Sequence, residues 1–278
     1  LWGKETLIVQ EQIRQDLNDS RIRVAQCGPA GEKLSRIANV IHDANRACGR
    51  GGLGAVFGSK NLRAIAVRGS QRAPVADADK VNEMAKWFRD NYMSTGAAVF
   101  STLATMRMVR VNNGAGGLPT RNFQDGVFEG FERISAETQL ATYTKARDTC
   151  FGCPIRCKWV VEVNDDEYKV DPKYGGPEYE TTAAFGSCCG IDDLRVTNTA
   201  NQVCNAMGLD TIGAGVTIAF AMECFERGYI GLEDTGGLEL RFGNAQAMLE
   251  MLRRLANREG FGDLLAEGSK RAALKIGR

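Results

Sequence analysis

Three cysteines close together are the residues whose type and spacing point most directly to chemistry. Cys150, Cys153 and Cys157 are separated by two and then by three residues. Thiolates are the usual ligands of iron–sulfur clusters, and a short loop can direct three of them at one cluster. Gly152 and Pro154 lie between them and are residue types that let a chain turn sharply. The spacing therefore predicts a [4Fe–4S] cluster whose fourth ligand lies elsewhere.

A zinc site and three buried thiols without a ligand are two less favoured interpretations of these cysteines. A zinc site usually adds a second Cys or His pair downstream at a similar spacing, but His42 is the only histidine and Cys188 and Cys189 are adjacent. Three buried thiols without a ligand are the remaining alternative. In a reducing compartment, clustered cysteines bind metal more often than they form disulfides. We expect the other cysteines to fill the core: Cys27, Cys48, Cys188, Cys189, Cys204 and Cys224.

The glycine-rich stretch 49–54 reads GRGGLG and matches the pattern of a dinucleotide-binding loop. That motif needs a helix immediately after it, and we expect the triplet 58–60, Gly-Ser-Lys, to interrupt any helix before a strand begins. A phosphate-binding P-loop would need Gly-Lys followed by Ser or Thr, which is a different order. The glycines could instead bring the backbone close to a flat or phosphorylated ligand, with Arg50 and Lys60 meeting its negative charge. A tight turn at a domain edge is the alternative.

The elements that must position these motifs divide into two regions. The first 70 residues mix short helical and extended patterns, and predict a helix over 11–17 and strands over 21–27 and 62–67. A linker is predicted over 71–78, where Pro74 lies among small and polar residues. The remainder is mostly helical, with an irregular glycine-rich loop over 112–130; the predicted helices cover 78–91, 135–147, 195–207, 211–227, 244–255 and 262–274. We therefore expect an α+β protein.

Composition and charge narrow the classes of partner. The chain has 278 residues, of which 44% are hydrophobic and 25% charged, and its formal net charge is +1. Because its cationic residues are scattered, nucleic acid and anionic membrane surfaces are not expected as main partners. No stretch is long and apolar enough for a membrane helix. The chain begins with Leu1 instead of Met, so we expect it to be a piece of a longer protein.

Several motifs together resemble the aldehyde ferredoxin oxidoreductase family. They appear in the order found in that family and cover most of the chain: 42–46 (HDANR), 49–65 (GRGGLGAVFGSKNLRAI), 118–123 (LPTRNF), the three clustered cysteines, 176–181 (GPEYET) and 208–212 (GLDTI). The resemblance implies a tungsten or molybdenum atom held by two pterin cofactors beside a [4Fe–4S] cluster. It also implies that residues 1–70 end a β-rich pterin-binding domain, and that 71–278 form most of a helical second domain carrying the cluster cysteines.

The resemblance implies roles for individual residues of the cofactor site. Arg50 would lie near a pterin phosphate, and the Gly51 backbone would contact a Mg²⁺ ion between the phosphates. Asp210 would accept hydrogen bonds from the polar edge of a pterin, which suits the ring's N–H donors. The pterin motif comprises Asn205, Gly208, Leu209 and Asp210. The family usually has Asp where Asn205 stands, so that contact would lack a charge.

The resemblance also implies a reaction, in which an aldehyde is oxidised to its carboxylic acid and electrons pass through the cluster to a ferredoxin-like carrier. Glu180 would accept the proton and Tyr179 would orient the substrate. The alternatives are that Glu180 is a buried carboxylate paired with an Arg, and that Tyr179 is a core aromatic. No Glu-x-x-His pair is present, so an iron-bridged dimer is not expected, whereas a homodimer or hetero-oligomer without such iron is compatible. A cytoplasmic, anaerobic setting is implied.

Two other functions remain open from the sequence. Relatives that reduce aromatic thioesters or other poor electron acceptors share the pterin and cluster motifs, so these motifs do not separate the two reactions. An electron-transfer module that holds only the cluster would need neither the glycine-rich stretch 49–60 nor the segment around Glu180.

Overall fold

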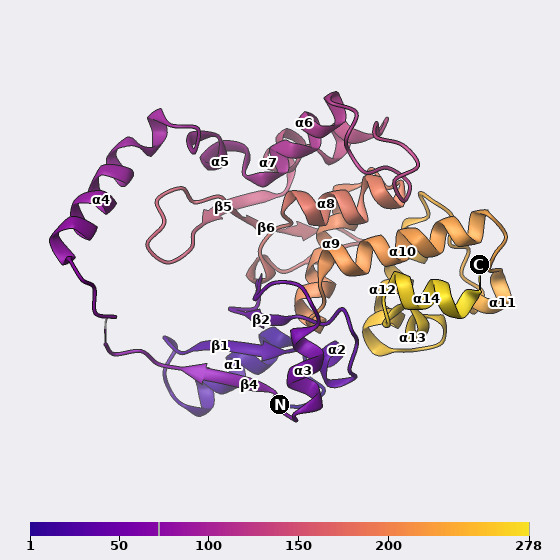
Figure 1. Ribbon diagram of the computed structural model, residues 1–278, viewed down its shortest axis with the longest axis horizontal. Coiled ribbons are helices and arrows are strands. Elements are labelled where there is room, and N and C mark those ends of the chain that lie inside the picture. Colours follow the sequence, from indigo (N-terminus) through magenta and orange to yellow (C-terminus); the bar gives the residue numbers. More distant parts are fainter. Residues whose placement is uncertain (72, 278) are drawn as a thin grey trace.

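The computed structural model describes residues 1–71 and 73–277. A small antiparallel sheet with short helices lies along the lower side in Figure 1, and a larger helical body lies above it and to its right. This arrangement confirms the predicted α+β class. The boundary predicted near residue 70 lies in a stretch without regular structure, and residue 72 of the predicted linker lies outside the described residues.

The sheet of the first region is antiparallel and its strand order is β3-β2-β1-β4. Two of its strands confirm the predictions for 21–27 and 62–67, and two shorter ones were not predicted. Ala25 in the central strand pairs with His42 on one side and with Ile65 on the other. The strands are β1 (Arg23–Cys27), β2 (Val40–His42), β3 (Arg46–Ala47) and β4 (Ala64–Val67).

Three short helices pack around this sheet: α1 (Thr6–Asp16), α2 (Pro29–Glu32) and α3 (Leu53–Ser59). Helix α3 begins directly after Gly52, so the expectation that no helix follows the glycine-rich stretch was wrong. Gly58 lies so close to α2 that an added Cβ would be 1.9 Å from the Gly31 carbonyl oxygen. This glycine therefore allows the two helices to approach closely, and α3 continues past it to Ser59.

A buried ion pair joins α2 to the beginning of β4. Arg63 Nε lies 2.7 Å from Glu32 Oε1, and the two side chains are only 8% and 4% exposed. The Arg63 guanidinium also donates to the Gln26 side chain and to the Lys4 carbonyl. Burial lowers the pKa of Arg63 and the charge of Glu32 opposes that effect. The charge of buried Arg63 is thus stabilised by its partner Glu32.

We expect Arg63→Met to destabilise the first region by about 3–5 kcal/mol, because it leaves the buried Glu32 carboxylate without a cationic partner. The measurement is the midpoint of thermal unfolding of the whole protein. Arg68→Met is the matched control, since Arg68 pairs with Asp19 at the surface and exposed pairs contribute about 1 kcal/mol or less. Equal midpoints for the two variants would contradict the prediction.

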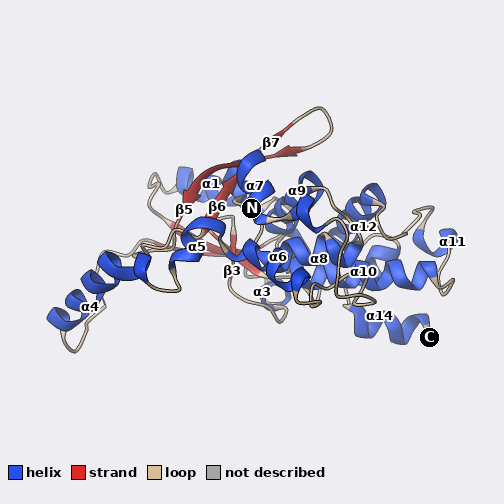
Figure 2. Ribbon diagram, turned by 90° about the horizontal axis from the view of Figure 1, so that it is seen from above, coloured by secondary structure: helices blue, strands red, loops and turns tan. Residues whose placement is uncertain are grey.

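Helix α4 (Ala78–Asn91) has the bounds that the sequence predicted. Its N-terminus is capped by Asp77, whose carboxylate accepts a hydrogen bond from Lys80 N at 2.9 Å. None of its residues is buried, and the helix projects from the body of the molecule in both overall views (Figures 1 and 2). The apolar side formed by Val81, Met84 and Trp87 is therefore exposed.

The helical body is centred on four helices: α8 (Tyr179–Phe185), α9 (Leu194–Met207), α10 (Thr211–Glu226) and α12 (Ala245–Asn257). The predictions for 195–207, 211–227 and 244–255 are confirmed. The prediction of one helix over 262–274 was wrong, because Gly268 adopts φ +85° and separates α13 (Phe261–Leu265) from α14 (Ser269–Ile276). Smaller helices complete the body: α5 (Ala98–Leu103), α6 (Met108–Gly114) and α11 (Leu232–Thr235).

Strand β5 replaces the end of the helix predicted over 135–147, so that part of the prediction was wrong. Helix α7 (Ala136–Thr142) ends well before residue 147, and strand β5 (Thr144–Asp148) follows it because that segment pairs with β6 (Lys158–Val161). The second hairpin joins β7 (Val163–Asn164) to β8 (Lys169–Val170). Short 3₁₀ helices lie between α4 and α9 in the described chain: η1 (Tyr92–Ser94), η2 (Thr105–Arg107), η3 (Phe131–Ile134), η4 (Pro172–Tyr174) and η5 (Ser187–Cys189). No helix among the described residues has the length and apolar character needed to cross a membrane.

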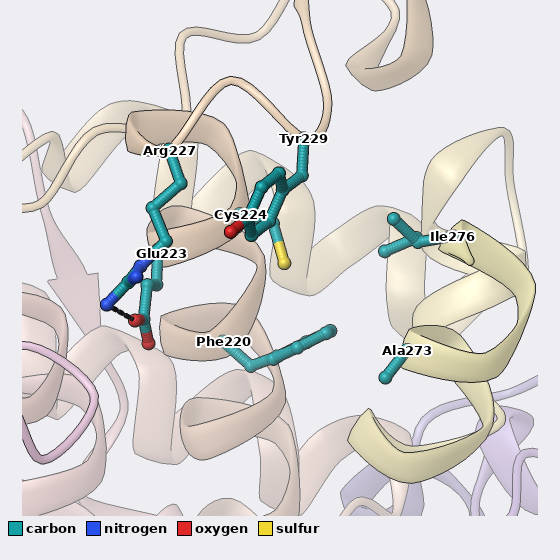
Figure 3. A pocket seen from close by; sticks show the side chains of 7 residues that line it. All are labelled: Phe220, Glu223, Cys224, Arg227, Tyr229, Ala273 and Ile276. Atoms are coloured by element: carbon teal, nitrogen blue, oxygen red, sulfur yellow. Dashed lines mark ion pairs between the residues drawn. The ribbon is translucent and has the colours of Figure 1, made fainter. Parts of the chain in front are cut away.

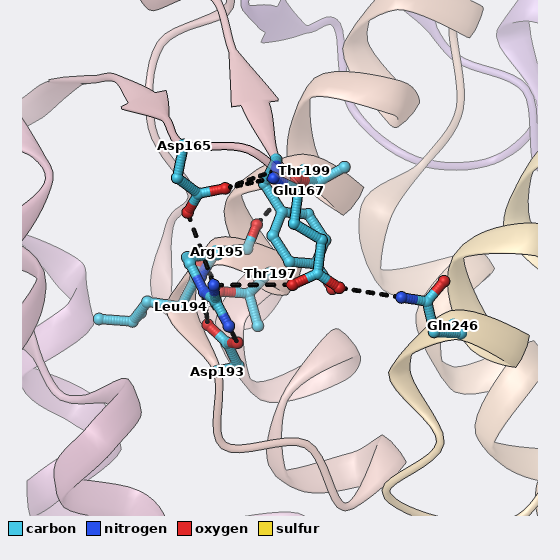
Figure 4. Close-up of polar contacts among 9 residues, drawn as sticks. Asp165, Glu167, Asp193, Leu194, Arg195, Thr197, Thr199 and Gln246 are labelled. Atoms are coloured by element: carbon cyan, nitrogen blue, oxygen red, sulfur yellow. Dashed lines mark hydrogen bonds and ion pairs between the residues drawn. The ribbon is translucent and has the colours of Figure 1, made fainter.

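Arg195 fixes the second hairpin to the start of α9 (Figure 4). Its guanidinium lies 2.6 Å from an Asp193 oxygen and within 4 Å of carboxylate oxygens of Asp165 and Glu167. It also lies over the Tyr168 ring, 5.0 Å from its centroid. Burial, and secondarily Glu167, raises the pKa of Tyr168 to about 12. This charged network therefore belongs to the scaffold.

Candidate cofactor site and catalytic segment

The loop between α2 and β2 meets the turn between α9 and α10 through backbone hydrogen bonds. Asn39 N donates to the Gly208 carbonyl at 2.8 Å, and Asp210 N donates to the Ile37 carbonyl at 2.9 Å. The contact is close, because a Cβ added to Gly28 would lie 2.2 Å from the Met207 carbonyl oxygen. These main-chain contacts between residues 37–39 and 208–210, which we call the seam, join the first region to the helical body.

Arg50 and Asp210 form an ion pair at this seam. Arg50 Nε lies 2.7 Å from Asp210 Oδ2, and their side chains are 60% and 8% exposed. Asp210 Oδ1 also accepts from Ile212 N at 3.1 Å and so caps α10. Added Cβ atoms at Gly49 and Gly51 would meet nothing within 4 Å, and both residues have positive φ. An open glycine loop beside an exposed guanidinium and a carboxylate has the chemistry to hold a phosphorylated ring system.

The other residues of the predicted pterin motif shape the turn. Asn205 is buried and its Nδ2 donates to the Tyr174 carbonyl at 3.1 Å. Gly208 ends α9 in the left-handed region, with φ 76°. Leu209 is buried, and its N–H donates to the Cys204 carbonyl at 2.8 Å. The predicted contacts of these three residues with a cofactor stay predictions.

The clustered cysteines lie on the loop between β5 and β6. Cys150 is exposed, whereas Cys153 and Cys157 are half-buried, so the alternative of three buried thiols was wrong. Cys153 N donates to the Cys150 carbonyl at 3.1 Å, which makes the turn between them tight. Over residues 1–71 and 73–277, no three Cys, His, Asp or Glu side chains are grouped closely enough to hold a metal ion. The donor set on this loop nevertheless has the chemistry of an iron–sulfur ligand set.

A broad cleft of about 1170 Å³ separates the cysteine loop from the sheet. Cys150, Phe151 and Gly152 line one side, and residues of β1, β2 and β4 line the other. The cleft leaves room beside the thiols. A smaller pocket of about 270 Å³ lies between α10 and α14, where Phe220, Cys224 and Ile276 face one another (Figure 3). That pocket contains none of the predicted site residues.

Tyr179 and Glu180 occupy the first turn of α8. Tyr179 OH accepts from Asn112 Nδ2 at 2.7 Å, and burial, with a smaller contribution from Glu180, raises its pKa. Glu180 is exposed, and no ion pair or hydrogen bond joins its carboxylate to another described residue. The alternative of a buried Glu180 paired with an Arg was therefore wrong.

Helix α8 places this first turn beside the cofactor seam. The Thr181 and Thr211 hydroxyl oxygens lie 2.8 Å apart, and Thr211 directly follows Asp210. The first turn of α8, which carries Glu180, therefore lies next to the first turn of α10, which Asp210 caps. The sequence analysis assigned no role to Asn112, Thr181 or Thr211, although the two threonines lie in the motifs 176–181 and 208–212.

Most of the other cysteines lie where the sequence predicted. Cys27, Cys188, Cys189, Cys204 and Cys224 are buried. Cys48 is exposed, so its expected place in the core was wrong; it directly follows β3, which is an edge strand of the sheet.

Comparisons with known protein families and with individual proteins point to the same family of oxidoreductases. The family model described as aldehyde ferredoxin oxidoreductase, domains 2 and 3, matches residues 80–278, and that of the N-terminal domain matches residues 1–69. A tungsten-containing aldehyde ferredoxin oxidoreductase of Pyrococcus horikoshii is 40% identical over 99% of this chain and 46% of its own length. The WOR-like subunit of an aliphatic sulfonate oxidoreductase of Pyrococcus furiosus is 32% identical over 90% of this chain and 40% of its own length.

Solved structures include a fold relative. The active-site complex BamBC of benzoyl coenzyme A reductase superimposes with a TM-score of 0.78 at 24% identity, covering 100% of this chain and 43% of the other. The chain spans about half the length of the curated relatives it matches.

Proposed function

The chain belongs to the aldehyde ferredoxin oxidoreductase family, and from this premise we propose that the whole protein oxidises aldehydes to carboxylic acids. Water supplies the added oxygen, two protons are released, and two electrons leave one at a time to a ferredoxin-like carrier. The bound tungsten or molybdenum bis-pterin supplies the two-electron chemistry, and a [4Fe–4S] cluster connects it to the carrier.

The Arg50–Asp210 pair is the observation that best supports this proposal. It joins the glycine loop of the first region to the end of the α9–α10 turn, 160 positions apart in the chain. A module that carries only a cluster needs no such seam. Within the proposed site, Arg50 would bind a pterin phosphate, Gly51 would contact Mg²⁺ through its backbone, and Asp210 would accept from the ring's donors.

The proposed roles of the remaining residues concern protons and electrons. Glu180, exposed and unpaired among the described residues, would take the proton from water or from the aldehyde hydrate. Tyr179, whose phenol is held by Asn112, would orient the carbonyl oxygen. Cys150, Cys153 and Cys157 would hold three corners of the cluster. We also propose a cytoplasmic, anaerobic setting, since reduced low-potential clusters and metal–pterin centres react with oxygen.

The testing experiment is metal analysis with EPR of the reduced, full-length protein purified without oxygen, together with aldehyde-dependent reduction of a one-electron dye. About one tungsten or molybdenum and about four irons per chain, with activity, would support the proposal. Iron without the heavy metal would favour a cluster-only module. Thioester reduction without aldehyde oxidation would favour the reductase alternative. Zinc as the only metal would overturn the assignment of an iron–sulfur cluster to the cysteine loop.

We expect Asp210→Asn to weaken cofactor retention by about 10- to 100-fold, because a charge-assisted hydrogen bond contributes about 1.5–3 kcal/mol. Asn still caps a helix, so the thermal midpoint should change little. The readout is tungsten or molybdenum per chain after gel filtration. Asp193→Asn is the matched control, because Asp193 likewise caps a helix, α9, and pairs with an arginine. Full metal content in Asp210→Asn would contradict the assignment.

A further inference from the structure

Tyr179 is held at both of its ends by one short segment, which comprises η2 and α6. Its backbone N–H donates to the Thr105 hydroxyl at 3.1 Å, and its phenol oxygen accepts from Asn112 Nδ2 at 2.7 Å. Two other side chains of the segment, Met106 and Val109, are fully buried. Because side chains in a packed core keep their places, this segment is a rigid support for Tyr179.

The same segment fixes the residue before Tyr179. The Thr105 hydroxyl donates to one carboxylate oxygen of Glu178, and Arg46 Nη1 lies 2.7 Å from the other. Glu178 directly precedes α8, so these two contacts hold the entry to the helix. The first turn of α8, which carries Tyr179 and Glu180, therefore has little freedom to rotate.

The direction of the hydrogen bond from Asn112 decides what the phenol can do. An amide nitrogen only donates, so the Tyr179 oxygen is the acceptor and the phenol keeps its own proton for another partner. Within the described parts of the chain, the Tyr179 hydroxyl donates to no other residue. Burial raises the pKa of the Tyr179 phenol, and the hydrogen bond from Asn112 opposes that effect, as a donor to the phenol oxygen should.

We propose that Asn112 is a positioning residue that makes Tyr179 the hydrogen-bond donor to the aldehyde oxygen. This inference rests on the proposed function, because it requires the aldehyde. As the oxygen of water bonds to the carbonyl carbon, a proton of that water passes to Glu180 and the C=O electron pair moves onto the carbonyl oxygen. Tyr179 donates to this oxygen while its negative charge develops, and Asn112 does not itself touch the substrate.

Two replacements of Asn112 separate this role from a structural one. Asp has nearly the shape of Asn, but its ionised carboxylate only accepts hydrogen bonds, so it takes the phenol proton away from the substrate. Leu leaves the phenol without a partner and its proton free. We therefore expect the near-isosteric Asp to be the more harmful replacement, whereas a residue that only filled space would give the opposite order.

The experiment is steady-state kinetics of aldehyde oxidation by the full-length holoenzyme, with tungsten, molybdenum and iron measured on each sample. We expect kcat to fall about 10²-fold in Asn112→Asp, the lower end of what one donor to a developing oxyanion contributes, with little change in KM. In Asn112→Leu the fall should be about 2- to 10-fold, as for one neutral hydrogen bond. Val111→Asp, which places the same charge on the exposed side of α6, is the matched control and should retain the wild-type kcat.

The same replacements in a Tyr179→Phe background connect the effect to the phenol. Without the hydroxyl, Asn112→Asp and Asn112→Leu should have equal effects, because residues that act through one group are not additive. A lower kcat in Asn112→Asp than in Asn112→Leu, found only when Tyr179 is present, would support the inference.

The opposite order, or the same difference in both backgrounds, would overturn the inference, as would an unchanged kcat in Tyr179→Phe. If Asn112→Asp does not hold the metals, Asn112→Leu alone is compared in the two backgrounds, and an equal loss in both would overturn it. Wild-type holoprotein that carries the metals but oxidises no aldehyde would instead overturn the proposed function, which separates the two failures.

Discussion

Replacing Glu180 with glutamine is expected to lower kcat for aldehyde oxidation by about 10²- to 10⁴-fold, the usual contribution of a general base. Glutamine has nearly the same shape but cannot accept the proton. Since Glu180 is exposed at the first turn of α8 and makes no hydrogen bond or ion pair with another described residue, its replacement should leave folding and metal content unchanged. Steady-state kinetics of the full-length enzyme, with iron and tungsten measured on the same sample, test this expectation.

Glu233→Gln is the matched control for that variant. Glu233 is an exposed carboxylate in the first turn of α11, at the opposite side of the helical body from α4 (Figure 1). The same chemical change there should leave kcat unaltered. If Glu180→Gln turned over as fast as wild type with full metal content, Glu180 would not be the proton acceptor.

Replacing Cys153 with serine should remove the [4Fe–4S] cluster. A serine hydroxyl does not ionise as a thiol does and is a poor ligand for these irons. We expect iron to fall well below about four per chain, the EPR signal of the reduced cluster to disappear, and electron transfer to a one-electron carrier to stop. Iron analysis and EPR of the anaerobically purified full-length protein measure these losses.

Cys48→Ser is the corresponding control, because Cys48 is also exposed but lies outside the cysteine loop. Its iron content and EPR signal should equal those of the wild type. An intact cluster in Cys153→Ser would show that another residue supplies the ligand, and the assignment of this loop would fail.

The long helices could be predicted from the sequence because their local signals agree. Helices α9 and α10 have apolar residues at helical spacing and are separated by Gly208, which the structure finds in the left-handed region. The segment 143–147 shows the opposite case. Its local pattern continued a helix, but cross-strand pairing with β6 made it a strand, and a pairing partner farther along the chain is not visible in a local window.

Some features of the candidate site could likewise be predicted from the sequence, and others could not. Motifs with contiguous residues, such as the cysteine cluster, were visible directly. The ion pair between Arg50 and Asp210 was not, because its members lie 160 positions apart in the chain. The burial of single polar groups is likewise a property of the folded chain, so the exposed Glu180 carboxylate could not be predicted from composition or spacing.

The seam between residues 37–39 and 208–210 is made largely of main-chain atoms, and this has a consequence for how the family can diverge. A hydrogen bond from Asn39 N to the Gly208 carbonyl uses groups that every residue except proline possesses. The hydrogen bonds that hold Arg50 and Asp210 in register therefore do not depend on which side chains stand at 37, 39 and 209. Proline at 39 or 210, which would delete a donor, or a side chain at Gly28 or Gly208, which would meet the main chain opposite, would break them. The geometry of the site is in this sense inherited with the backbone.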